Sequence, residues 1–145
     1  KLIGIQAISF DKMNQLRHVK FLQNKEHTLA LMKEHAKILK PKFDMVVSTL
    51  EREIAPLGIA TWHKPKGGYF VSVNTTPGLA KRTLALAKEA GVVMTSAGAT
   101  YPYGHDPADS NIRVAPSLPP VEELEQAMAV FCCCLKLAAL EKSRK

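Results

Sequence analysis

The chain has 145 residues, 46% of them hydrophobic, which suits one compact domain with its own core. Its net charge of +7 would suit a nucleic-acid-binding protein. The basic residues are, however, spread along the chain with Asp and Glu between them, and no nucleic-acid-binding motif accompanies them, so we do not expect nucleic acid as the partner. No apolar stretch approaches the roughly 18–20 residues that cross a bilayer, so we expect no membrane span.

Two helices are expected at the start of the chain, over residues 11–23 and 25–54. Apolar residues recur there at spacings of three and four, and Asp11 is a good N-cap. The phase of the second helix continues across Pro41. Because proline lacks an N–H and clashes with the preceding turn, we expect either one long kinked helix or two coaxial pieces.

Two antiparallel strands are expected next, over residues 59–63 and 69–74. Both segments are rich in β-branched and aromatic residues, and a turn containing Gly67 and Gly68 joins them.

A third helix is expected over residues 79–90, with Thr75 or Thr76 as N-cap before Pro77 and with Gly91 as its stop. Short strands are expected over residues 92–95 and 111–115, and a last helix begins after Pro119 and Pro120. This order predicts an α+β domain, a small mainly antiparallel sheet of three to four strands covered by helices, with a long kinked N-terminal helix.

Three consecutive cysteines, Cys132, Cys133 and Cys134, lie in the last helix. Neighbouring helical residues point about 100° apart, so these thiols cannot converge on one metal or form disulfides with one another. They indicate core or near-core packing, and a reducing compartment such as the cytoplasm. The histidines lack metal-ligand spacing, so we expect no metal site.

One arginine, Arg113, stands inside the apolar strand near the end of the chain. A guanidinium within a strand needs an anionic partner, because burying it unpaired is costly. That partner is either a local acid such as Asp106 or Asp109, or an anionic ligand, and the residues alone leave both open.

Five motifs follow one another along most of the chain. They are KGGYF (Lys66–Phe70), the helix ending at Gly91, VVMTSAGATYPYG (Val92–Gly104), NIRVAPS (Asn111–Ser117) and EELEQAM (Glu122–Met128). In this order they resemble the end of class I aminotransferases, fold-type I enzymes that use pyridoxal 5'-phosphate (PLP). NQLRHVKF (Asn14–Phe21) resembles the MocR-related aminotransferase-like subgroup.

The resemblance implies that residues 1–145 are the C-terminal small domain of such an enzyme, which transfers an amino group between an amino acid and a 2-oxo acid. It implies that Arg113 binds the substrate α-carboxylate, which suits a planar, bidentate guanidinium. It also places Tyr101 and Tyr103 in the loop at the substrate entrance, where the alternative is an exposed loop aromatic. Tyr69 is a further substrate-binding candidate, with a core tyrosine beside a tight turn as its alternative.

The chain lacks the sequence context of the Schiff-base lysine and a Gly-rich phosphate loop, so the resemblance implies that the large cofactor-binding domain lies upstream. We therefore expect no catalytic residue and no cofactor-binding residue here, an inert isolated chain, and a homodimer for the intact enzyme. The alternatives are a ligand-sensing aminotransferase-like module of a transcription regulator and a basic nucleic-acid-binding α+β module.

Overall fold

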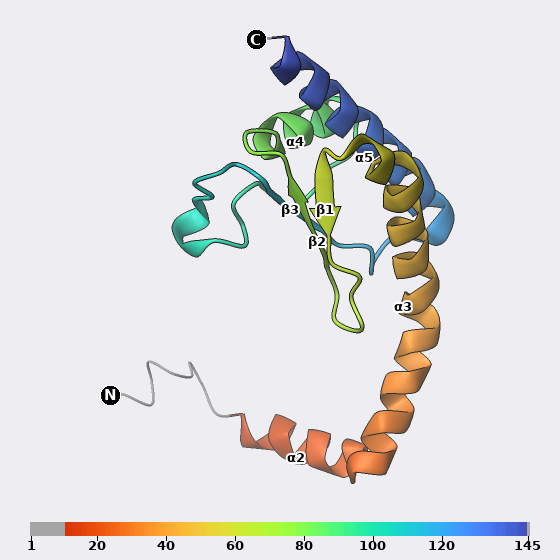
Figure 1. Cartoon of the computed structure of the whole chain (residues 1–145). Helices are drawn as coiled ribbons and strands as arrows, with labels where there is room; N and C mark the ends of the chain where they lie inside the picture. Colours follow the sequence, from red (N-terminus) through yellow and green to blue (C-terminus); the bar gives the residue numbers. More distant parts are fainter. Residues whose placement is uncertain (1–10, 145) are drawn as a thin grey trace. The chain divides into compact units, whose positions relative to one another are not determined.

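The structure, a computed structural model, describes residues 11–144 (Figure 1). By the compactness of its contacts the chain divides into two units, which meet between Ile38 and Leu39. In the first unit, helix α2 spans Lys12–Leu22, and the Asp11 carboxylate accepts a hydrogen bond from the Asn14 N–H at 2.9 Å, as expected of an N-cap. No residue of α2 is buried.

Helix α3 spans Lys25–Glu53 and passes through Pro41 without a break. The prediction of a long kinked helix is thus confirmed in its one-helix form, with Pro41 inside the helix (Figure 1). The boundary between the two units falls within this helix. Its last turns bury Val46, Thr49 and Leu50, and the short 3₁₀ turn η1 (Ala55–Leu57) follows.

The second unit contains a three-stranded antiparallel sheet in the order β1-β2-β3. Its strands are β1 (Ala60–Trp62), β2 (Val71–Thr75) and β3 (Asn111–Val114). In the register, Trp62 pairs with Val73 and Ser72 pairs with Arg113. The predicted α+β class and mainly antiparallel sheet are confirmed.

The strand predicted over residues 92–95 is wrong, since no strand forms there. The Val92 N–H donates to the Ala87 carbonyl at 2.8 Å, and Gly91 has φ +90°, so the segment begins as the end of a helix. Val93 is 81% exposed. An apolar run this short takes its structure from its neighbours, and here the neighbour is the helix terminus.

Two further helices, α4 (Ala80–Glu89) and α5 (Val121–Ser143), complete the second unit. The core joins the end of α3, one face of the sheet, α4 and α5, and Figure 1 shows these helices gathered on one side of the strands. Its largest fully buried side chains include Phe131, Leu50, Ile54, Leu79 and Ile112.

The predicted cap of α4 by Thr75 or Thr76 is wrong. Thr75 belongs to β2, and its hydroxyl donates to the Ser110 carbonyl at 3.1 Å. Asp109 takes the role instead: its carbonyl accepts the Ala80 N–H and its carboxylate accepts the Lys81 N–H, both at 3.0 Å. A residue distant in sequence thus satisfies the orphan donors that begin this helix.

The cysteines largely follow the prediction. Cys132 and Cys134 are buried in the core side of α5, and Cys133 is exposed. Burial raises the pKa of the Cys132 thiol to about 11, so it stays protonated at neutral pH. Within residues 11–144 no helix is long and apolar enough to cross a membrane, and no three side chains are grouped to hold a metal ion.

Candidate functional site

The two faces of the sheet differ in chemistry because side chains alternate along each strand. One face carries Val71, Val73, Ile112 and Val114, which belong to the core. We call the other face the polar sheet face. It carries, by strand alternation and register, Thr61, Ser72, Asn74, Asn111 and Arg113.

Arg113 is half-buried on the polar sheet face. Within residues 11–144 no carboxylate lies within 4.0 Å of its guanidinium, so neither Asp106 nor Asp109 is its partner. Its Nε has less than 1 Å² exposed and, among the described residues, no hydrogen-bond partner. The guanidinium carbon lies 4.5 Å from the centre of the Phe70 ring, a cation–π contact. In the part of the chain that the structure describes, Arg113 is therefore contacted by a ring, and no acidic side chain pairs with its charge.

Asp106 is occupied elsewhere. Its carboxylate accepts backbone N–H groups from Ala108 at 3.0 Å, and from Ser110 and Asn111 at 2.8 Å each. These bonds, that from Asn111 first, lower the pKa of the Asp106 carboxyl below its usual value. The buried carboxylate thus shapes the loop that leads into β3.

Asn111 joins this loop to the sheet. Its side-chain amide donates to the Ser72 hydroxyl at 2.9 Å and to the Asn74 side-chain oxygen at 2.7 Å. Its own oxygen accepts the Thr100 hydroxyl at 2.7 Å. Since Asn111 and Arg113 share one face of β3, the same network fixes the surroundings of the arginine.

The loop before β3 turns back on itself at its tip. Gly98 has φ +82°, and a Cβ there would overlap the carbonyl oxygen of Gly104. Only glycine tolerates both this conformation and this approach. Between these glycines lie two of the predicted site residues.

These two residues, Tyr101 and Tyr103, differ in their surroundings. Tyr103 lies in the short 3₁₀ turn η2 (Pro102–Gly104) with φ +57°, and its side chain is fully exposed. Tyr101 is 37% exposed. Within the described residues, no hydrogen bond or ring contact joins either tyrosine to Arg113.

Tyr69 lies just before β2 and is 61% exposed, so the alternative of a core tyrosine is wrong. Its neighbour Phe70 makes the ring contact with Arg113 instead. The structure therefore brings together Arg113 and Phe70, with Asn111 two residues along the strand. Within residues 11–144 no hydrogen bond or ring contact joins Arg113 to Tyr69, Tyr101 or Tyr103.

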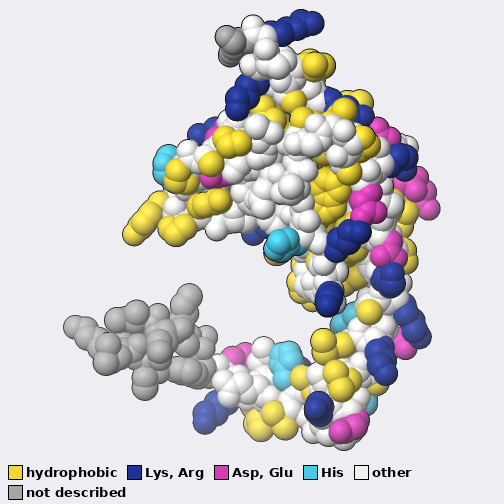
Figure 2. Space-filling view, in the orientation of Figure 1, with side chains coloured by type: hydrophobic (Ala, Val, Ile, Leu, Met, Phe, Trp, Pro, Cys, Tyr) yellow, Lys and Arg dark blue, Asp and Glu magenta, His cyan; other side chains and the backbone are white. Residues whose placement is uncertain are grey.

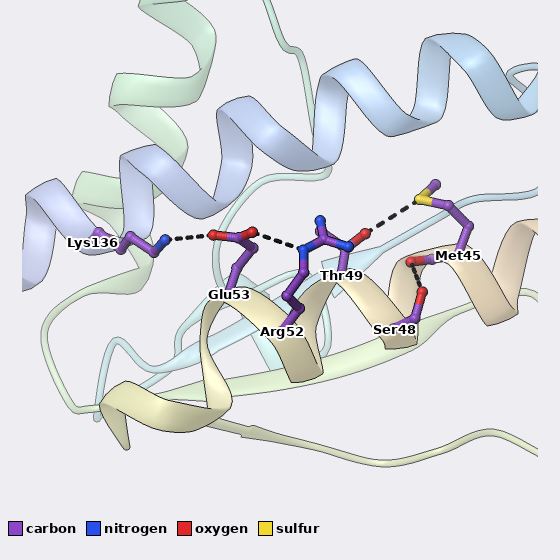
Figure 3. Close-up of polar contacts among 6 residues, drawn as sticks. All are labelled: Met45, Ser48, Thr49, Arg52, Glu53 and Lys136. Carbon is purple, nitrogen blue, oxygen red and sulfur yellow. Dashed lines mark hydrogen bonds and ion pairs between the residues drawn. The ribbon is translucent and has the colours of Figure 1, made fainter.

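A second polar cluster lies between α3 and α5 (Figure 3). Glu53 accepts from Lys136 at 2.8 Å and from Arg52 at 2.9 Å, and Thr49 donates to the Met45 sulfur at 3.6 Å. A cavity of about 450 Å³ adjoins it, lined also by Cys132 and Cys133 among others. The charges in this cluster pair with one another, and Lys136 lowers the pKa of Glu53, so the cluster ties two helices together.

Charge on the visible surface is mixed. Figure 2 shows basic side chains interspersed with acidic and hydrophobic ones, without a continuous basic stripe. Several of these are paired: Arg82 forms two bonds to Glu141, at 2.7 and 2.8 Å, and Lys37 contacts Glu34 at 2.7 Å.

Sequence reasoning missed the parts played by Phe70, Asn111 and Asp106. The strand predicted over residues 69–74 does place Phe70, Ser72 and Asn74 on one face by alternation, which is a usable signal. The pairing of β2 with β3, however, joins segments far apart in the chain, and no local pattern sets that register.

Comparisons with known proteins agree on one family. The family model for aspartate amino-transferase matches residues 1–145. An aspartate aminotransferase of Corynebacterium glutamicum is 48% identical over 138 residues, which are 95% of this chain and 32% of that protein.

Solved structures give the same result. An aspartate transaminase from Corynebacterium glutamicum superimposes with a TM-score of 0.88 and 47% identity, covering 97% of this chain and 33% of that one. The kynurenine aminotransferase of Pyrococcus horikoshii, solved in complex with PMP, matches with a TM-score of 0.60 and 26% identity over 69% of this chain and 24% of its own. The chain thus spans about a third of the length of these relatives.

Proposed function

The chain belongs to the aspartate amino-transferase family, and from this premise we propose that it is the C-terminal small domain of a PLP-dependent aminotransferase. In this proposal residues 1–145 form the domain that binds the α-carboxylate of an amino acid and of a 2-oxo acid, while the rest of the protein holds the cofactor. We further propose a cytoplasmic homodimer for the intact enzyme. Assignment to the MocR-related subgroup stays a prediction.

The observation that carries the proposal is the unpaired guanidinium of Arg113. It is half-buried, it has no carboxylate partner among residues 11–144, and its Nε is an orphan donor. The terminal nitrogens carry four N–H donors in one plane, the arrangement that binds a carboxylate through two parallel bonds.

Two bonds to the α-carboxylate fix orientation as well as position. A carboxylate held through both oxygens has its plane and its C–Cα axis fixed, so Cα is held at a constant place relative to the reacting group. The neighbouring network of Asn111, Ser72 and Thr100 holds the surrounding backbone in place. Tyr69, Tyr101 and Tyr103 are proposed to line the approach to this site from the exposed side.

PLP supplies the electron-withdrawing ring for the bond changes at Cα. The described residues suit the substrate carboxylate and do not suit the cofactor phosphate. A phosphate site favours free N–H groups at a helix N-terminus. Here Asp109 occupies the first N–H groups of α4, and α5 begins at Pro120 with acidic residues in its first turn. We therefore assign no cofactor contact to this chain.

The test is Arg113→Ala in the full-length protein. The affinity for amino acid and oxo acid should fall on the order of a hundredfold or more, because two charge-assisted bonds are lost. The PLP content, measured by absorbance, should stay the same. Arg113→Lys should lie between, since lysine keeps the charge and loses the planar fork.

Unchanged substrate affinity in Arg113→Ala would contradict the carboxylate assignment. Absence of any amino-group exchange by the full-length protein, despite bound PLP, would instead favour the alternative of a ligand sensor in a transcription regulator. The two outcomes are measured separately, one by binding and the other by product formation.

A further inference from the structure

Phe70 is the side chain that contacts the guanidinium of Arg113, at 4.5 Å from ring centre to Cζ. It lies just before β2, after the glycine pair of the turn, and its side chain is 46% exposed. The ring therefore has one part against the arginine and another open to solvent.

Sheet geometry explains how the contact arises. Ser72 pairs directly with Arg113, and Phe70 is two residues before Ser72, so ring and guanidinium are diagonal neighbours on the same face. Diagonal cross-strand neighbours lie about 7–8 Å apart at their backbones, within reach of two long side chains. The register of β2 with β3 thus sets the contact, and a slip by one residue would remove it.

The kind of contact matters for binding. An aromatic ring engages the guanidinium through its face, whereas hydrogen bonds leave from the edges in the guanidinium plane. A carboxylate neighbour would hold the arginine as firmly, but it would occupy those edges and cancel the charge. Arg113 has the ring contact and, within residues 11–144, no such acid.

We propose that Phe70 is a positioning residue: its ring holds the guanidinium of Arg113 in the orientation that receives the substrate carboxylate, without competing for its N–H groups. This inference rests on the proposed function of Arg113 and adds a second residue to it. Phe70 itself need not touch the substrate.

The experiment uses the full-length protein with bound cofactor and four variants: Phe70→Leu, Phe70→Tyr, Arg113→Ala and the double variant Phe70→Leu/Arg113→Ala. Phe70→Leu removes the ring and keeps an apolar side chain, while Phe70→Tyr keeps the ring. Each variant is measured for kcat and KM with 2-oxoglutarate as acceptor. Each is also measured for inhibition by propionate and by its uncharged amide, propionamide.

We expect Phe70→Leu to raise the KM for 2-oxoglutarate and the inhibition constant of propionate about 2- to 30-fold, the range that a cation–π contact corresponds to. The values for kcat and for propionamide should change by less than about twofold, and Phe70→Tyr should resemble the unchanged protein. In the Arg113→Ala background the Phe70→Leu change should have no further effect, because it acts through the arginine.

Three results would overturn the inference: no effect of Phe70→Leu on the carboxylate ligands, an equal effect on propionamide, or an undiminished effect when Arg113 is absent. The thermal midpoint of each variant separates these from a loss of folding, and Phe70→Met serves if the leucine variant unfolds. If Arg113→Ala alone leaves carboxylate binding unchanged, the proposed function fails, and that result is distinguishable from a silent Phe70.

Discussion

The two faces of the small sheet are stabilised by different kinds of interaction. The inner face is made of aliphatic side chains that α3, α4 and α5 cover, and its members are almost fully buried. The polar sheet face is held by hydrogen bonds among Asn111, Ser72 and Asn74 and by a ring against Arg113. The stability of the inner face should depend on how well the side-chain volume fills the core. The stability of the polar sheet face should depend on whether each hydrogen-bond partner is present.

The largest effect should follow from a change behind the inner face. Phe131 is fully buried on α5, so Phe131→Ala should lower the free energy of unfolding by about 3–5 kcal/mol, from lost transfer energy and a cavity. Urea unfolding of the chain followed by circular dichroism measures it. Leu137→Ala, at a 45% exposed position of the same helix, is the matched control and should cost far less. Equal losses would show that the core is not where the structure places it.

A smaller effect should follow on the polar sheet face. Asn111→Leu keeps a similar volume but leaves Ser72, Asn74 and Thr100 without their partner, so we expect a loss of about 2–3 kcal/mol. Thr100→Val removes a single bond and should cost about 1 kcal/mol. The same urea titration compares them. A leucine variant as stable as the original protein would erase the contrast between the two faces.

The smallest and most local effect concerns pH. The pKa of the Asp106 carboxyl is lowered in the folded chain by its backbone hydrogen bonds. Its contribution is therefore fully present above the usual carboxyl pKa of about 3.9 and is lost as the pH falls through the lower, folded value. Amide hydrogen exchange of Ser110 and Asn111 should accelerate over that acid range.

The control for this experiment is Asp106→Asn, which cannot titrate at this position. Its exchange rates at Ser110 and Asn111, corrected for the intrinsic rate, should be faster than in the original chain and should lack the acid transition. An acid transition of the same size in Asp106→Asn would assign it to another group.

Local patterns predicted most of the fold. Helical spacing located α2, α3, α4 and α5, and alternation located β1, β2 and β3, because each signal lies within one short segment. The errors came where distant residues decide. Asp109 caps α4 in place of a local threonine, and residues 92–95 continue from a helix end and do not pair with a strand.

The candidate site was predictable in part for the same reason. Arg113 is conspicuous because an arginine stands in an apolar strand, so its sequence alone singles it out. Phe70 becomes its neighbour only through the register of two strands that are distant in the chain, and Asp106 is withdrawn from it only by the fold of the loop. The residues next to Arg113 in the sequence indicate that it needs an anionic partner, whereas its neighbours in space depend on how distant segments pair.

The cap of α4 has a consequence for how the loop before β3 can move. Asp109 accepts a hydrogen bond from α4, and Asp106 accepts one from the first residue of β3, so residues 106–111 are held at both ends. Within the described residues, no side-chain hydrogen bond anchors Tyr103 at the tip of the loop, and its side chain is fully exposed. The fold should therefore tolerate substitution of Tyr103, and a graft that exchanges residues 101–103 alone, with Thr100 and Gly104 kept, offers a way to vary substrate range without breaking the bond to Asn111.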